Sequence, residues 1–106
     1  MDKESINWTE LKKFLKKVDE AFPLERAILF GSRVKGNALK ESDYDIILVS
    51  SHFLGLSFFK RIEILLDMWE MKEELEVLPY TPDEFSRKGS EICVVQEAIK
   101  EGIDLL

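Results

Sequence analysis

The sequence predicts one α/β (α+β) domain, a small mixed β-sheet flanked by helices. Helical and strand patterns follow each other in the order helix, strand, short helix, strand, helix, strand and two helices, with a further short strand at the end. The apolar run Ile46–Val49 suits a central strand that helices cover on both faces. With 106 residues and 45% hydrophobic residues, the chain can form one core, so we expect residues 1–106 to be a single domain.

The first helix is expected from Trp8 to about Ala21. Asn7 is a suitable N-cap, and Glu10 completes a spacing like that of a capping box. Pro23 stops the helix. The apolar residues of this helix and its end fall on one stripe: Trp8, Leu11, Leu15, Val18 and Phe22.

The next segments predict two strands and two helices. Arg26–Phe30 is expected to be a strand, followed by a short helix from Ser32 to about Leu39. Asp43–Ser50 is the second expected strand, and a helix should run from Phe58 to about Met71. The buried stripe of that helix is expected to contain Phe58, Ile62, Leu65, Leu66 and Trp69.

Glu74–Tyr80 is the third expected strand, and Pro79 places it near an edge because proline lacks an amide donor. The segment Thr81–Glu84 then starts a helix, with threonine as N-cap, proline at the first position and glutamate at the third. We expect this helix to end near Gly89.

Ser90 is expected to cap the last helix, and Gly102 to follow its end. Residues 103–106 could add a final short strand. The buried residues of the last helix are expected to be Ile92, Val95 and Ile99.

Composition excludes several classes of protein. The 15 basic and 21 acidic residues give a net charge of −6, which argues against a protein that coats nucleic acid. One cysteine and one histidine exclude an internal disulfide and a Cys-rich zinc site, and they favour a cytoplasmic location. We expect no membrane span and no signal peptide, because no apolar run exceeds four residues. Lys12, Lys13, Lys16 and Lys17 form either a solvated face or a contact for an acidic partner.

Gly31 and Ser32 lie where the first strand ends and a helical turn begins. Glycine lets a ligand approach the backbone, and a helix start offers free amides to an anion. Ser32 adds a hydroxyl, while Arg33 and Lys35 add positive charge. These residues could hold the β- and γ-phosphates of a nucleotide, although a Gly-Ser pair is also an ordinary turn.

Ten residues separate Ser32 from Asp43, and Asp43 and Asp45 lie at the start of the second strand. Residues i and i+2 of a strand share a face, so the two carboxylates should lie roughly 6–7 Å apart at Cα. A divalent cation would turn their repulsion into binding, and paired Mg²⁺ ions serve nucleotidyl transfer. The plainer alternative is two solvated aspartates.

A third carboxylate could come from the next strand. Glu76 is flanked by apolar residues there and could face the same site. Glu74 shares its face by alternation and is a rival, and either could simply be an exposed strand residue.

Taken together, these features resemble a known family. The stretch GSRVKGNALKESDYDIILV resembles the minimal nucleotidyltransferases (MNT), a branch of the DNA polymerase β-like nucleotidyltransferase superfamily, and the segment Tyr80–Phe85 resembles it too. The resemblance covers about residues 8–102 and places Glu76 at the third-carboxylate position. The family more often has aspartate there, and glutamate is one methylene longer.

The resemblance implies a polymerase β-like fold and transfer of a nucleoside monophosphate, with AMP from ATP as the expected case. Gly31 and Ser32 would bind the nucleotide phosphates, assisted by Arg33. The catalytic and metal-binding residues would be Asp43, Asp45 and Glu76. They would hold two Mg²⁺ ions, with Mn²⁺ as an alternative.

Proteins of this family are similar to antitoxins encoded beside HEPN-domain toxins, and some transfer AMP to a tyrosine of the toxin. The resemblance therefore implies a HEPN partner, and because the chain lacks an obvious HEPN-like helical bundle, that partner would be separately encoded. From the charge and the short apolar runs we expect neither direct nucleic-acid binding nor a membrane. One alternative is a weakly catalytic or non-catalytic antitoxin that neutralises its partner by complex formation. Another is a small-molecule nucleotidyltransferase, but only about 60 residues follow Asp45 to build an acceptor pocket. The sequence specifies neither the acceptor of the nucleotidyl group, nor the nucleobase of the nucleotide, nor the oligomeric state.

Overall fold

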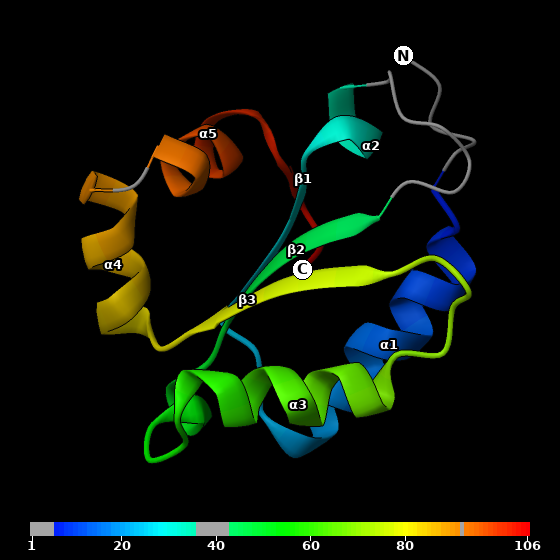
Figure 1. Cartoon of the computed structure of the whole chain (residues 1–106), viewed down its shortest axis with the longest axis horizontal. Coiled ribbons are helices and arrows are strands. Elements are labelled where there is room, and N and C mark those ends of the chain that lie inside the picture. The colour runs from blue at the N-terminus through cyan, green and yellow to red at the C-terminus, as the bar shows by residue number, and fades with distance from the viewer. Residues whose placement is uncertain (1–5, 36–42, 92) are drawn as a thin grey trace.

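A computed structural model describes residues 6–35, 43–91 and 93–106. The chain forms a mixed α/β domain, which confirms the predicted fold class (Figure 1). The elements in chain order are α1 Trp8–Ala21, β1 Arg26–Phe30, α2 Ser32–Lys35, β2 Tyr44–Val49, a 3₁₀ turn Ser51–Phe53, α3 Phe58–Met68, β3 Leu75–Tyr80, α4 Pro82–Glu91, α5 Cys93–Glu101 and β4 Ile103–Asp104.

The four strands form one sheet in the order β3-β2-β1-β4. β1 pairs antiparallel with β2 and with β4, whereas β2 and β3 are parallel. Parallel neighbours need a crossover connection, and α3 supplies it between β2 and β3. β2 is therefore an interior strand and β3 an edge strand, as the apolar run and Pro79 predicted.

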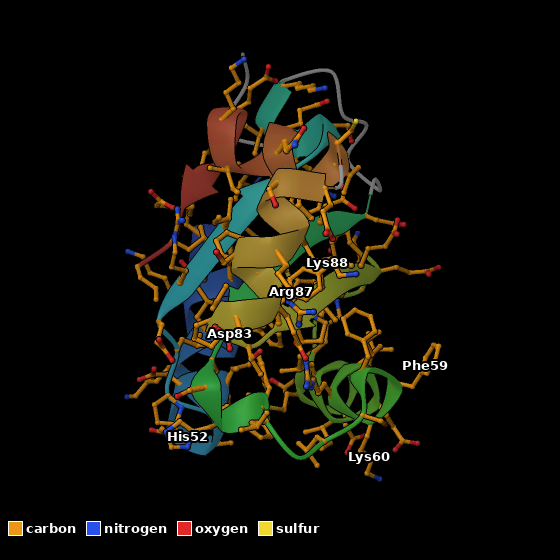
Figure 2. The ribbon with its side chains drawn as sticks, turned by 90° about the vertical axis from the view of Figure 1, so that its left-hand side faces the viewer. His52, Phe59, Lys60, Asp83, Arg87 and Lys88 are labelled. Carbon is orange, nitrogen blue, oxygen red and sulfur yellow. The ribbon has the colours of Figure 1, made fainter. Side chains whose placement is uncertain are left out.

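Helices cover both faces of the sheet. α1 and α3 lie on one face and α4 and α5 on the other (Figure 1), and the side view shows α4 in front of the strands (Figure 2). Side chains alternate along each strand, so the sheet separates two apolar clusters. Ile46 and Leu48 belong to the cluster under α1 and α3, and Ile47 and Val49 to the cluster under α4 and α5.

α1 has the predicted bounds because its signals are local. The side chain of Asn7 accepts a hydrogen bond from the Glu10 amide at 3.2 Å, which caps the first turn. Its buried residues are Leu11, Phe14, Leu15 and Val18, so Phe14 joins the predicted stripe while Trp8 is only half-buried.

The α3 prediction was wrong in two respects. The helix ends at Met68, before the predicted Met71, because the Trp69 indole donates to the Glu73 carbonyl and draws the chain into the next turn. Leu66 was expected to be buried but is 45% exposed. Arg61 is buried instead, although it is charged.

The boundary between α4 and α5 was also misplaced. α4 continues to Glu91, and the Ser90 hydroxyl donates to the Arg87 carbonyl, so Ser90 lies inside α4 and does not cap α5. The β2 and β3 strands are slightly shorter than predicted, and the predicted end of α2 near Leu39 lies outside the described residues.

The burial predicted for α5 was right at Val95 and wrong at Ile99. Val95 is fully buried, but Ala98 takes the next inward position and Ile99 is 43% exposed. Ile92 lies outside the described residues. Gly102 follows the helix, as expected, and its amide donates to the Ala98 carbonyl at 2.8 Å.

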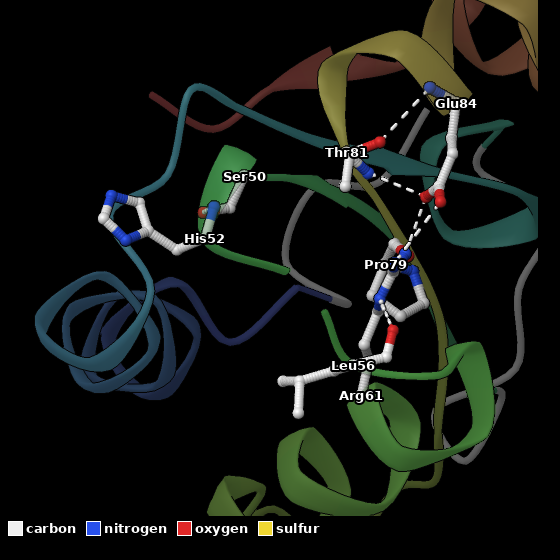
Figure 3. Close-up of polar contacts among 7 residues, drawn as sticks. All are labelled: Ser50, His52, Leu56, Arg61, Pro79, Thr81 and Glu84. Carbon is white, nitrogen blue, oxygen red and sulfur yellow. Dashed lines mark hydrogen bonds and ion pairs between the residues drawn. The ribbon is translucent and has the colours of Figure 1, made fainter. Parts of the chain in front are cut away.

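A buried polar network joins α3, β3 and α4 (Figure 3). The Arg61 guanidinium donates to the Glu84 carboxylate at 2.6 Å, to the Pro79 carbonyl at 3.0 Å and, through Nε, to the Leu56 carbonyl at 3.0 Å. Glu84 also accepts from the Thr81 amide, while its own amide donates to the Thr81 hydroxyl, which confirms the predicted capping box. This network holds α4 against the sheet.

In the part of the chain that the structure describes, no helix is both long and apolar enough to cross a membrane.

Candidate active site

Three side chains line up across the ends of β1, β2 and β3. Phe30 is the register partner of Asp45, and Asp45 is the register partner of Glu76. Partners in register share a face of the sheet, and alternation puts this row on the same face as Ile47 and Leu78. The fold therefore brings Asp45 and Glu76 together, although they are 31 residues apart in the sequence.

The turn after β1 packs directly on Asp45. Gly31 has φ +85°, and a Cβ added there would overlap Oδ2 of Asp45 and lie 3.0 Å from its Cγ. The Gly31 carbonyl accepts hydrogen bonds from the amides of Val34 and Lys35, which starts α2. Ser32 follows this contact immediately, so the two sequence motifs meet at one place in the fold.

We expect Gly31→Ala to destabilise the fold by about 2–4 kcal/mol and to displace the Asp45 carboxyl. The left-handed backbone conformation accounts for about 1–2 kcal/mol and the overlap for the rest. Gly55→Ala is the matched control, because Gly55 has φ +94° but open space around it. Urea unfolding of both variants measures the difference, and an equal loss of stability in both would rule out a specific contact with Asp45.

The site carries uncompensated negative charge. The pKa of Asp45 is raised from 3.8 to about 6, first by burial and then by the nearby charges of Glu76 and Asp43. The positive charge of Arg33 lowers this pKa, but only in part. Asp43, which immediately precedes β2, thus lies close enough to Asp45 for their charges to interact.

The register separates Glu76 from its rival Glu74. Glu76 stands beside Asp45 and raises its pKa. Glu74 lies just before β3, where its backbone carbonyl accepts from the Tyr44 amide at 2.9 Å. Glu76 is thus the better candidate for a third carboxylate.

Arg33 occupies a position that the sequence did not indicate. Its side chain is only 1% exposed, and the guanidinium lies 4.0 Å from the centre of the Tyr44 ring. Tyr44 belongs to the apolar cluster under α1 and α3, and its hydroxyl accepts from the Asn7 amide. Arg33 therefore supports the packing behind the site, whereas Ser32 is half-exposed beside it.

A cavity of about 490 Å³ opens in front of the carboxylates. Its wall contains Asp45 and Glu76 among mostly apolar side chains from β1, β3, α3 and α5. Ile62 and Val94 approach it from the two helices. Val94 had no signal in the sequence, because the start of α5 was misplaced and a single exposed valine is common on protein surfaces.

The donor set fits a hard cation such as Mg²⁺, which prefers carboxylate oxygens and substrate phosphates. The charges of Glu76 and Asp43 act on Asp45, and a cation bound among these carboxylates would offset their repulsion. Within residues 6–35, 43–91 and 93–106, no three His, Cys, Asp or Glu side chains converge on one point as they stand. Asp43, Asp45 and Glu76 would have to turn toward a common ion.

The nucleotidyltransferase domain profile matches residues 11–104, from the first turn of α1 to β4. The chain belongs to the nucleotidyltransferase domain family. This confirms the superfamily that the Gly-Ser and Asp-x-Asp motifs indicated. No curated protein matches the sequence.

Solved structures share the fold of this nucleotidyltransferase domain. A Sulfolobus solfataricus protein provisionally described as a nucleotidyltransferase has a TM-score of 0.64 and 22% identity, with 92% of this chain and 77% of that chain covered. BolA1 of Arabidopsis thaliana has a TM-score of 0.57 and 16% identity, with 71% and 94% covered. The BolA domain of SufE1, also from Arabidopsis thaliana, has the same score and identity, with 74% and 98% covered.

At these identities the likeness concerns the fold alone. Proteins named for BolA share it with one described as a nucleotidyltransferase, so the arrangement of strands and helices does not select an activity. The family match and the residues at the end of the sheet carry the functional argument.

Proposed function

We propose that this nucleotidyltransferase domain transfers AMP from ATP to a hydroxyl group of a protein and depends on Mg²⁺. The observation that carries the proposal is the in-register placement of Asp45 and Glu76, with Gly31 packed on Asp45. It places a glycine turn suited to phosphates and a carboxylate pair side by side on adjoining strand ends.

Each residue of the site has a proposed task. Asp43, Asp45 and Glu76 would hold Mg²⁺, which when bound neutralises phosphate charge and favours the ionised form of the attacking hydroxyl. The Gly31 backbone and the Ser32 hydroxyl bind the β- and γ-phosphates. The buried positive charge of Arg33 makes the electrostatic potential at the phosphates more favourable. Glu76 accepts the proton of the attacking hydroxyl.

The reaction is an in-line displacement at the α-phosphorus of ATP. The acceptor oxygen forms a bond to the α-phosphorus, the bond to the bridging oxygen of the β-phosphate breaks, and pyrophosphate leaves. Positioning and charge stabilisation supply most of the rate enhancement in such transfers. The cavity beside Glu76 opens to solvent and suits an acceptor side chain that is brought by another molecule.

The proposed acceptor is a tyrosine of a separately encoded HEPN-domain protein in the cytoplasm. The resemblance of residues 31–49 to the minimal nucleotidyltransferases supports this choice. The proposed activity would make the chain an antitoxin that silences its partner by modification.

A second candidate is neutralisation by complex formation with a weak or unused catalytic site. Two observations favour it: Glu76 is one methylene longer than the usual aspartate, and the three carboxylates do not converge among the described residues. Small errors of position are costly in catalysis.

The deciding experiment incubates the chain with ATP, MgCl₂ and the product of the neighbouring gene, which is the proposed HEPN partner. Mass spectrometry of the partner should show the addition of one AMP moiety, which EDTA prevents. A partner that is inhibited but unmodified would leave only complex formation. In that case the triple variant Asp43→Asn/Asp45→Asn/Glu76→Gln should still silence the toxin at equal dosage.

Glu76→Gln should lower the transfer rate roughly 100-fold or more, because glutamine cannot accept the hydroxyl proton. ATP affinity, measured by calorimetry, should change much less. Glu74→Gln is the matched control, since it makes the same chemical change two residues away. Equal losses in both variants would contradict the assigned role of Glu76.

A further inference from the structure

A second cavity, of about 480 Å³, adjoins the first along β3. Leu78 lines both cavities. The residues of the second cavity are Phe58, Leu78, Tyr80, Glu84, Arg87 and Lys88. We call the two cavities together the β3 groove.

The β3 groove follows strand β3, and side chains from both faces of the strand line it. Glu76, Leu78 and Tyr80 alternate along the strand, so their side chains point to the same side. Four strand residues span about 13 Å. The groove thus runs from the carboxylates at Glu76 to Tyr80 and is long enough for about four residues of an extended chain.

The two ends of the β3 groove carry opposite charge. Asp45 and Glu76 lie at one end, and Arg87 and Lys88 at the other. Figure 2 shows Arg87 and Lys88 on the flank of α4 that lies above α3. Among the described residues, neither cation has an ion-pair partner. The nearby Glu84 carboxylate does not neutralise them, because Arg61 already binds it.

The end of the β3 groove at Arg87 and Lys88 also contains two aromatic side chains. The rings of Phe58 and Tyr80 lie 5.7 Å apart at an angle of 34°, and both line the cavity. An acidic side chain next to an apolar one would complement this mixture. A nucleic acid would need more phosphate contacts than two cations offer in a chain of net charge −6.

The strand order places the β3 groove away from the Gly31-Ser32 turn, which is the proposed phosphate-binding turn. Gly31 follows β1, whereas the groove follows β3, and β2 with Asp45 lies between them. In the proposed function, the nucleotide occupies the β1 side of Asp45. The β3 side is then left for the acceptor.

We propose that the β3 groove binds an extended acidic segment of the acceptor protein, with an acidic side chain at Arg87 and Lys88 about four residues from the tyrosine at Glu76. This inference rests on the proposed function and adds a recognition rule to it. Charge and apolar contact at the far end would hold the tyrosine hydroxyl in place at the carboxylates.

The test uses two fluorescein-labelled peptides of equal length, each with one tyrosine. One peptide carries two glutamates about four residues from the tyrosine, and the other carries two lysines there. Fluorescence anisotropy in low salt should show at least about tenfold tighter binding of the glutamate peptide. Arg87→Glu/Lys88→Glu should abolish that preference, and Arg87→Gln/Lys88→Gln should reduce it.

Lys12→Glu/Lys16→Glu is the matched control, because it reverses two exposed charges on α1, which covers the other face of the sheet. This variant should keep the preference. If it loses the preference as completely as the α4 variant, the lysines of α1 are the contact and the inference is overturned.

ATP affinity separates the groove from the nucleotide site. The ATP affinity should be the same in the Arg87→Glu/Lys88→Glu variant as in the wild type. If the variant loses ATP affinity together with the peptide preference, the two cations bind the nucleotide phosphates and the inference is overturned. Binding of single-stranded RNA that depends on Arg87 and Lys88 would also overturn the inference.

Transfer assays separate the inference from the proposed function. An unmodified partner together with an intact peptide preference would refute the transfer alone. Transfer whose KM for the acceptor is unchanged by Arg87→Glu/Lys88→Glu would refute the groove alone.

Discussion

Asp45→Asn is expected to abolish nucleotidyl transfer and, at the same time, to stabilise the fold at neutral pH. The loss of transfer should be at least about a thousandfold, because Asp45 is the central carboxylate between Gly31 and Glu76. The gain in stability has a separate cause, which is the unfavourable charge of this carboxylate in the folded protein.

The sign of the stability change follows from the pKa of Asp45. Folding raises this pKa from 3.8 to about 6, so the folded state binds the proton more tightly than the unfolded state. Asp45 therefore contributes stability below about pH 4, and this contribution is lost as the pH rises to about 6. The full shift corresponds to roughly 3 kcal/mol, and we expect about 1–2 kcal/mol after solvent screening of this partly exposed carboxyl.

Thermal unfolding of wild type and Asp45→Asn at pH 4 and pH 7 measures this effect. The variant should be more stable at pH 7, and the difference should vanish near pH 4. Saturating Mg²⁺ should reduce the difference at pH 7, because only the wild type has the full carboxylate set. Asp67→Asn is the control, since Asp67 is exposed on α3. A variant less stable than wild type at both pH values would contradict the electrostatic account.

Arg61→Ala is expected to destabilise the fold by about 3 kcal/mol. Arg61 is 5% exposed and bonds to Glu84, Pro79 and Leu56. Removing it takes the cation from the Glu84 carboxylate, which keeps only the Thr81 amide, and takes a donor from two backbone carbonyls. Breaking a buried pair costs about 3–5 kcal/mol. The lower end applies because the Glu84 side chain is 28% exposed. The melting temperature of a domain of this size should fall by about 12–24 °C.

Lys60→Ala is the control for Arg61→Ala. Lys60 is the preceding residue of α3 and pairs with Glu63 on the exposed surface, so its loss should change stability little. Comparable losses in the two variants would show that α3 helicity, and not the network, is at stake.

The pH dependence gives a second readout for Arg61→Ala. Arg61 holds the pKa of Glu84 below its usual value of 4.5. A depressed carboxyl pKa stabilises the fold above that value and loses this contribution as the pH falls through the folded pKa. The Arg61→Ala variant should therefore lose less stability on acidification than the wild type.

The elements that could be predicted from the sequence are those with local signals. Asn7 and Thr81 cap their helices through contacts within one turn, so α1 and the start of α4 were predicted correctly. Pro79 indicated an edge strand because the missing amide is a property of one residue. The Gly-Ser turn and the Asp-x-Asp spacing likewise depend on residues that are close in the chain, and they were sufficient to indicate the superfamily.

The details that the sequence left open depend on contacts between distant segments. The parallel register of β2 and β3 set Glu76, and not Glu74, beside Asp45, and alternation along a strand cannot distinguish the two. Arg33 and Arg61 are buried because Tyr44 and Glu84 meet them from other elements. Composition assigns arginine to the surface, since only a partner brought by the fold can offset the loss of hydration of a buried charge.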